Sequence, residues 1–506
     1  MSEEGNKMAL VHLEHVKDPP PLDDSGLVGA HRQGEETMLL AHKTDRRLLL
    51  KIDLVLIPFA SALYVAAFLD RSNLGNARLQ GLESQVLDDD DSKFSLALAC
   101  FYITYIVLSI PATVMAKAIP ANRAIAMGAI TWSIAATCQA SAKRPGGLYA
   151  ARLFVGVGEA AFGQSLPLYL SYWYKKNQLA KRVGLFVCGG ALAGAFGGLI
   201  AFGVSSIKHP VIEEWRILFL IEGLPSLVLG ILAFFFLPGR PQTTRFLSES
   251  QRELILGKLE GDSLGEAKDG VDWKGVQRAL SDWRCYVTAL MYSCMNLGLG
   301  SVTSFLPTII AGLGYTNARA QLFTVPPYAV AFVCMILLTS ISDHYRTRGS
   351  LVACVFACGI LGWAILYGVT ADHPSDSQLR VRYFGSISVV VAGYCAIPLI
   401  LAWTANNSGS QSQRAVALGM LNTVGQCLSV LATYSFPSSE KPQYKRGTIL
   451  NIAFQAMGFC IAIGLTVFYR WENGRRNKVE GGEPADGVTV DVVHDHDLAK
   501  GFRYIP

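Results

Sequence analysis

The sequence predicts an all-α polytopic membrane protein with twelve transmembrane helices in two bundles of six. Charged residues make up only 16% of the 506 residues and hydrophobic residues 51%, whereas about 25% of a typical soluble protein is charged. A membrane-spanning helix needs roughly 20 mostly apolar residues, and twelve runs of that kind occur along the chain. A polar stretch separates the first six runs from the last six, which indicates two bundles joined by a linker.

The apolar runs set the order of the elements. In the first half they lie near residues 54–76, 94–116, 124–142, 148–173, 183–204 and 217–237. In the second half they lie near residues 286–312, 322–341, 351–370, 384–404, 415–436 and 449–469. The predicted organisation is therefore a disordered N-terminal tail (1–45), an N-terminal six-helix bundle (46–237), a linker (238–284), a C-terminal six-helix bundle (285–471) and a C-terminal tail (472–506).

The N-terminal tail and the linker are the main polar segments. Residues 1–45 are polar and acidic, and they lack the early apolar core of a signal peptide. The linker contains Ser248-Glu-Ser-Gln251, a capping-box pattern that is typical of a helix start, followed by an amphipathic stretch at residues 253–259. We expect a surface helix there with no chemistry of its own.

Lysine and arginine in the short loops predict the orientation of the chain, because cytoplasmic loops carry an excess of both residues. The even number of helices places both tails on one side, and the loops on that side are richer in basic residues, most clearly in the first half. Both termini are therefore expected in the cytoplasm. The expected localisation is a membrane crossed many times, namely the plasma membrane.

Several classes of function have no support in the sequence. The eleven cysteines lie in or beside apolar runs without any C-x-x-C pair, so neither disulfides nor a metal site is expected. No phosphate-binding loop occurs. The G-x-S-x-G match at residues 261–265 follows no strand and is read as chance. We expect no enzyme and no cofactor, and the net charge of +5 is too small to indicate nucleic-acid binding.

Ionisable residues inside the predicted helices are few. Such residues are costly in a membrane and mark transport pathways. Arg152 and Glu159 are seven residues apart, so they share one helix face about 10.5 Å apart along the axis. This pattern suits a cavity in which the arginine holds an anion and the glutamate takes up a proton. The alternative is a structural ion pair with another helix.

Two further sites near helix ends carry charge. Asp70 and Arg71 are adjacent and point about 100° apart. Arg71 could join Arg152 in a two-arginine clamp for a carboxylate, or Asp70 could pair with Arg152 as a gate, and both can hold in different states. Glu222, one turn or more inside the sixth helix, favours a packing or gating role over substrate contact.

Several motifs resemble one family. The segment Leu69-Asp-Arg-Ser-Asn-Leu-Gly-Asn-Ala77 is similar to the L-D-R-x-N-I-G-N-A motif of the fungal anion:cation symporter family of the major facilitator superfamily (MFS), whose branch includes allantoate, nicotinate and pantothenate permeases. Further matches follow in order at Phe101-Tyr-Ile-Thr-Tyr105, Trp215-Arg-Ile-Leu-Phe219, Pro326-Pro-Tyr328, Ala405-Asn-Asn407, Pro442-Gln-Tyr-Lys-Arg-Gly447 and Phe502-Arg-Tyr504. One superfamily loop signature departs from the pattern, because residues 116–123 lack its acidic residue.

The resemblance implies roles for individual residues. Arg71 and Arg152 look like the arginines that bind a substrate carboxylate, and Glu159 and Asp70 look like the proton-coupling acids. The resemblance also implies cavity-lining residues, namely Tyr102, Tyr105, Asn296, Tyr328 and Asn407, and two gating residues, Asp343 and Arg346. Glu222 joins the gating candidates through its position in the sixth helix.

The expected function is proton-coupled symport of a small organic anion, a carboxylate vitamin or nitrogen source such as nicotinate, pantothenate or allantoate, by a monomer in the lipid bilayer. The alternative is an exporter of an acidic secondary metabolite with the same fold, because the sequence does not set the direction. A non-transporting nutrient receptor would need an extended cytoplasmic domain, and the 35 residues after Trp471 are too few.

Overall fold

The computed structural model describes residues 24–174, 176–263, 272–315, 317–369, 375–484, 492 and 495–506. The chain divides into two units, Met1–Leu56 and Ile57–Pro506. The first unit contains the beginning of helix α2, and the second contains every candidate site residue named above. Residues 1–23 and 264–271, which belong to the predicted tail and linker, lie outside the described residues.

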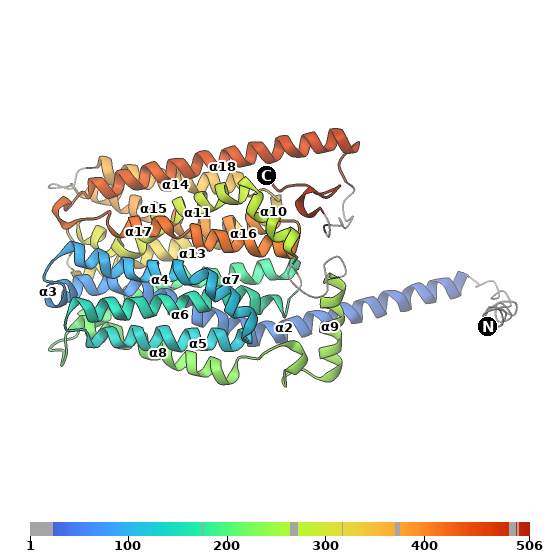
Figure 1. Ribbon diagram of the computed structural model, residues 1–506, viewed down its shortest axis with the longest axis horizontal. Coiled ribbons are helices and arrows are strands. Elements are labelled where there is room, and N and C mark those ends of the chain that lie inside the picture. The colour runs from blue at the N-terminus through green and yellow to red at the C-terminus, as the bar shows by residue number, and fades with distance from the viewer. Residues whose placement is uncertain are drawn as a thin grey trace. The chain divides into compact units, whose positions relative to one another are not determined.

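Within the described residues, twelve stretches of helix follow the predicted order, and Figure 1 shows those of the second unit running side by side. The first half contains α2 (Asp24–Ala77), α4 (Asp91–Ala118), α5 (Ala121–Cys138), α6 (Pro145–Ser171), α7 (Lys176–Ser205) and α8 (Glu214–Phe236). The second half contains α11 (Trp283–Ala311), α13 (Val325–Tyr345), α14 (Gly349–Gly368), α15 (Asp376–Asn406), the pair α16 (Gln411–Val424) and α17 (Cys427–Thr433), and α18 (Lys445–Glu480). This confirms the all-α fold class.

Ten helical segments among the described residues are long and apolar enough to cross a membrane on their own account. Helices α5 and α6 are not among them, although they pack between spanning neighbours: α6 contacts α4 and α5, and α5 contacts α8. The mean hydropathy of helix α6 is too low for a spanning segment, because this helix carries Arg152 and Glu159. This helix thus brings charge into the bundle at the expense of apolar content.

Two elements differ from the expected pattern. Residues 24–45, predicted to be disordered, are helical and belong to α2, and this stretch contains no proline, the residue that breaks helices. The apolar run at 415–436 is interrupted between Val424 and Cys427, which gives two helices, α16 and α17, instead of one.

The linker contains the expected surface helix and a second one. Helix α9 (Glu249–Ser263) starts at the predicted capping box: the Gln251 amide donates to Ser248 Oγ and the Ser248 amide donates to Gln251 Oε1, both at 3.3 Å. Helix α10 (Trp273–Ser281) follows and is capped by the Asp272 side chain, which accepts from the Lys274 amide at 3.1 Å. It packs on α16.

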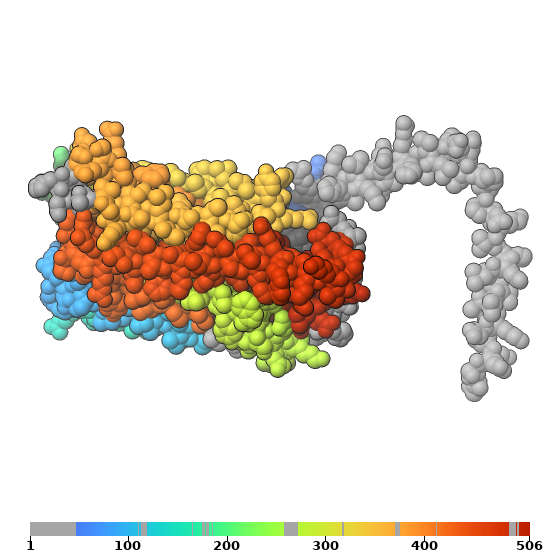
Figure 2. Space-filling view, turned by 90° about the horizontal axis from the view of Figure 1, so that it is seen from above, coloured from blue at the N-terminus to red at the C-terminus, as the bar shows by residue number. Residues whose placement is uncertain are grey.

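The end of the chain docks against the second half. We call residues 495–506 the C-terminal segment; Figure 2 shows this segment beside α10 at one end of the molecule. Its Asp497 is fully buried and accepts a hydrogen bond of 2.9 Å from Arg278 Nε of α10. It also pairs with Arg284 of α11. Trp403 Nε1 of α15 donates to the Ile505 carbonyl at 2.8 Å.

These contacts explain the ionisation of Asp497. Burial acts to raise the pKa of its carboxyl, but the hydrogen bond from Arg278 and the charges of Arg284 and Arg278 outweigh burial, so this pKa lies well below its usual range. Asp497 is therefore an anion at neutral pH, and it binds one arginine of the linker and one of the C-terminal bundle.

Candidate functional site

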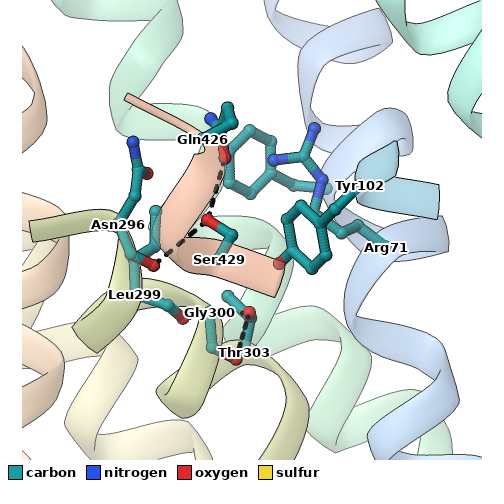
Figure 3. A pocket seen from close by; sticks show the side chains of 9 residues that line it. Arg71, Tyr102, Asn296, Leu299, Gly300, Thr303, Gln426 and Ser429 are labelled. Atoms are coloured by element: carbon teal, nitrogen blue, oxygen red, sulfur yellow. Dashed lines mark hydrogen bonds between the residues drawn. The ribbon is translucent and has the colours of Figure 1, made fainter. Parts of the chain in front are cut away.

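A small pocket lies between the two halves of the second unit. Arg71 and Phe68 of α2 and Tyr102 of α4 line it from the first half (Figure 3). The second half contributes residues of α11 and the start of α17, namely Asn296, Leu299, Gly300, Thr303, Gln426 and Ser429. Its free space is about that of a single water molecule, so this state is contracted around the site.

Arg71 is the cation of this pocket. Its guanidinium lies over the rings of Phe68 at 4.7 Å, Phe101 at 4.9 Å and Tyr105 at 5.7 Å from the ring centroids. An aromatic face attracts a cation, by about 2 kcal/mol or more where water is excluded. The three rings hold the guanidinium in place and leave its remaining edge to polar partners.

Glu159 of α6 occupies that edge. Its carboxylate forms a salt bridge with Arg71 Nη2, and the side chains of Arg71 and Glu159 are only 13% and 2% exposed. Separating such a buried pair leaves an uncompensated charge, which is strongly unfavourable. The pocket therefore contains a positive charge that is neutralised from within the protein.

Close packing of α6 sets the position of Glu159. A Cβ atom on Gly158 would lie 2.5 Å from the Trp132 amide nitrogen and 2.6 Å from the Gly128 carbonyl oxygen, both in α5. A Cβ atom on Gly156 would lie 2.6 Å from the Phe101 carbonyl oxygen of α4. The two glycines let α6 approach both neighbours at backbone distance, and this brings Glu159 to Arg71.

The break between α16 and α17 forms the opposite wall. The backbone carbonyl of Gly425, in the interruption, accepts a hydrogen bond of 2.9 Å from Asn296 Nδ2 of α11. Ser429 Oγ donates to Gln426 Oε1 at 3.0 Å and lies 3.4 Å from the Asn296 carbonyl (Figure 3). Interrupted helices are tolerated at membrane depth where they line a cavity. This wall offers amide and hydroxyl groups without a formal charge.

Asp70, Arg152 and Glu222 lie apart from the pocket lining. All three are at most 3% exposed and come from α2, α6 and α8 of the first half. Arg152 Nη1 donates to the Asp70 backbone carbonyl at 3.4 Å. The structure thus brings Arg152 close to α2 just before Arg71, whereas Glu159, two turns further along α6, reaches Arg71 itself.

The remaining predicted residues are spread over the molecule. Tyr102 and Asn296 line the pocket, and Tyr105 lies beside Arg71. Tyr328 instead packs against Tyr394, with ring centroids 5.6 Å apart. Asn407 donates to the Ile505 carbonyl at 3.0 Å, in the C-terminal segment.

The predicted gating pair of the helix-eight loop lies at the end of α13. Asp343 accepts a hydrogen bond of 2.8 Å from Arg348, and Arg346 caps the helix in a left-handed conformation with φ of 50°. The proposed roles of these residues stay predictions.

The sequence interpretation did not single out several pocket residues, namely Phe68, Leu299, Gly300, Thr303, Gln426 and Ser429. Those on α11 sit within a run of glycine, serine and threonine at residues 298–304, which is the available signal for a helix side that faces a cavity. Gln426 and Ser429 depend on the interruption of the eleventh apolar run, which hydropathy alone does not reveal.

At the end of the bundles opposite the C-terminal segment, contacts join the two halves. Asp91 accepts from the Ser438 amide at 2.6 Å and from Ser438 Oγ at 2.8 Å, and it also pairs with Arg78. Ser205 Oγ of α7 donates to Gln321 Oε1 at 3.1 Å. We call these bonds the closing contacts, because they hold α4 and α7 of the first half against the second half.

Two helical bundles around one pocket, with its charged lining on the side of the first half, are typical of secondary transporters. A family model described as the Major Facilitator Superfamily matches residues 60–433, and the chain belongs to this superfamily. It is a multi-pass membrane transporter and not an enzyme.

Relatives in fungi and one solved structure agree with this assignment. The chain is 30% identical to the MFS-type transporter efuF of Hormonema carpetanum, over 90% of this chain and 91% of that protein. It is 32% identical to the MFS transporter prlL of a fungal species (strain NRRL 50135), over 88% of this chain and 90% of that protein. The xylose transporter XylE from E. coli, in a partially occluded inward-open conformation, shares the fold with a TM-score of 0.62 at 15% identity, over 81% of this chain and 96% of that chain.

Proposed function

We propose that the protein is a proton-coupled symporter of a small organic anion, within the branch that the sequence motifs resemble. The observation that carries the proposal is that Arg71 lines the pocket while it forms a salt bridge with Glu159. An anion and Glu159 compete for the same guanidinium, so binding of the anion depends on what happens to the glutamate.

The competition gives a mechanism for coupling. In the empty site, Arg71 and Glu159 neutralise each other. A proton that binds Glu159 removes the negative charge and releases the guanidinium, whose fork then accepts a substrate carboxylate. The loaded site is again neutral, with one proton and one anion in place of the internal pair. Neutral amide and hydroxyl groups of Asn296, Gln426 and Ser429 would hold the rest of the substrate.

Alternating access moves such a site between the two sides of the membrane by rocking of the two halves. The closing contacts support a state that is shut at the end opposite the C-terminal segment. Because the loops on the side of the tails are richer in lysine and arginine, we infer that the tails are cytoplasmic and that the closed end faces outward. We further infer a monomer in the plasma membrane.

The test is transport in vesicles that contain only the purified protein. Labelled nicotinate, pantothenate and allantoate would be offered with and without an inward pH gradient. With one proton per anion, each unit of gradient supports about tenfold accumulation. Glu159→Gln should abolish this accumulation but keep exchange of anion for anion, because a neutral amide at this position leaves Arg71 free. Glu253→Gln, the same change on the exposed surface of α9, is the matched control and should transport normally.

Two results would contradict the proposal. Accumulation that still follows the pH gradient in Glu159→Gln would remove this residue from coupling. If no anion in the panel moves in either direction while the protein is folded, the pocket does not serve small carboxylates. Efflux of a preloaded anion driven by an inward proton gradient would instead favour the alternative, an exporter that exchanges protons for the anion.

A further inference from the structure

Behind the pocket, the first half contains a second group of buried charges. Asp70 and Glu222 are 1% and 3% exposed, and Arg152, close to Asp70, is 1% exposed. None of them is among the residues that line the pocket. They come from three helices, α2, α8 and α6. The packing of these helices, and not proximity in the sequence, therefore brings them together.

The two carboxyl groups lack ordinary hydrogen-bond partners. Within the described residues, both oxygens of Asp70 and both oxygens of Glu222 are buried without a hydrogen bond, as are Nε and Nη2 of Arg152. Uncharged groups surround them: Ser226 of α8 and Trp132 of α5 lie beside Asp70. The charged groups that face Asp70 are Arg152, Glu159 and Glu222. The charged group that faces Glu222 is Asp70.

The charges in this region do not balance if all groups are ionised. Arg71 and Glu159 neutralise each other in the salt bridge. One guanidinium, that of Arg152, then remains for two carboxylates, Asp70 and Glu222. A surplus negative charge in an apolar interior is highly unfavourable, and two carboxylates that share a site do not both stay ionised.

From this geometry we propose that Asp70 and Glu222 hold one proton between them, so that α2 and α8 form a proton-binding site separate from the anion pocket. The protonated group and the remaining carboxylate together carry one negative charge, which Arg152 balances. The site involves Glu222, for which the position in the sequence indicated only a packing or gating role. It does not depend on which substrate the pocket carries.

Infrared spectroscopy of the purified full-length chain, in a detergent that contains no carbonyl group, tests this proposal without any substrate. At neutral pH, exposed carboxyl groups are ionised, whereas a shared buried proton gives the carbonyl-stretch band of a protonated carboxylic acid. We expect this band in the native protein. Labelling of aspartate and glutamate carboxyls with ¹³C, each in turn, should shift it, because the proton belongs to an Asp–Glu pair.

Variants locate the proton. Glu222→Gln should remove the band, because Asp70 then remains as the single partner of Arg152 and ionises. Glu253→Gln, the same change on the exposed surface of α9, leaves these charges untouched and should retain it. A native protein without the band, or a band that persists in Glu222→Gln, would overturn the proposal. The isotope shift in the native chain decides the question even if Glu222→Gln does not fold.

Discussion

Arg71 combines two kinds of contact that a lysine would not reproduce together. Its planar guanidinium lies over three aromatic rings while Nη2 binds Glu159. A lysine ammonium keeps the charge but lacks both the flat face and the fork. The shape of the cation, and not only its charge, therefore decides how an anion is held in the pocket.

We predict that Arg71→Lys weakens anion binding. Loss of a hydrogen bond between charged groups costs about 1.5–3 kcal/mol, which corresponds to roughly 10- to 150-fold in affinity. Titration calorimetry with an anion that the native protein transports would measure the loss of affinity. Arg240→Lys is the matched control, since Arg240 also lies over a ring, that of Tyr172 at 5.1 Å, but away from the pocket. Unchanged affinity in Arg71→Lys would exclude Arg71 as the anion-binding residue.

The charged residues of the site could be predicted from the sequence, whereas their pairing could not. Ionisable groups are rare inside apolar runs, so Arg152, Glu159 and their neighbours stand out. Their partners, however, depend on the rotation of each helix in the bundle. The two-arginine clamp stays a prediction, because in this state Arg71 lines the pocket and Arg152 lies beside Asp70.

At the scale of elements, the crossing of α5 and α6 depends on single atoms. We predict that Gly158→Ala destabilises the protein by about 1–3 kcal/mol, because the new methyl group would meet backbone atoms of α5 that cannot turn away. Thermal unfolding in detergent measures the loss. Gly147→Ala is the control in the same helix, where nothing lies within 4 Å of the added Cβ. Equal melting temperatures for the two variants would contradict the close approach.

The C-terminal segment is an element in its own right, held by a buried anion. Asp497→Asn removes the charge that Arg278 and Arg284 share, so we predict a lower melting temperature at neutral pH. Because the pKa of Asp497 in the folded protein is below its usual range, its contribution is present at neutral pH. The contribution is lost as the pH falls through the folded pKa.

The pH dependence provides the measurement for this segment. Melting temperatures of the native chain and Asp497→Asn should differ at neutral pH and converge in strongly acidic buffer. Asp495→Asn, two residues earlier and exposed, should match the native protein throughout. A difference that persists unchanged into acid would mean that the charge of Asp497 does not hold the segment.

The helices themselves could be predicted well and their ends less well. Apolar length identifies the spanning runs, since a bilayer demands it. The interruption at Gly425 and the docking of the C-terminal segment arise from contacts with distant residues, such as Asn296 and Trp403. Asn407 illustrates the limit: its motif resembles the family pattern, but its side chain binds the C-terminal segment.

At the scale of the whole molecule, the closing contacts should control which side of the membrane the pocket faces. We predict that Asp91→Asn weakens the bonds to Ser438 and Arg78 and favours opening at that end. In a background without reactive native cysteines, Ser429→Cys in the pocket should then react faster with a membrane-impermeant thiol reagent added from outside.

A neighbouring residue provides the control for this experiment. Asp88, in the loop before α4, pairs with Lys93 of α4 and is 75% exposed, so Asp88→Asn should leave the labelling rate unchanged. Equal rates in all three proteins would show that the bonds of Asp91 do not hold the outer end shut.

The salt bridge of Arg71 and Glu159 has one more consequence, for the empty carrier. A transporter that moved a proton without an anion would dissipate the gradient that drives it. Here a proton on Glu159 alone would leave the buried guanidinium of Arg71 with no counter-charge, in a contracted pocket with room for about one water molecule. That state is electrostatically unfavourable for a return across the membrane. We therefore expect a low proton leak, because the empty site recloses on its own internal ion pair.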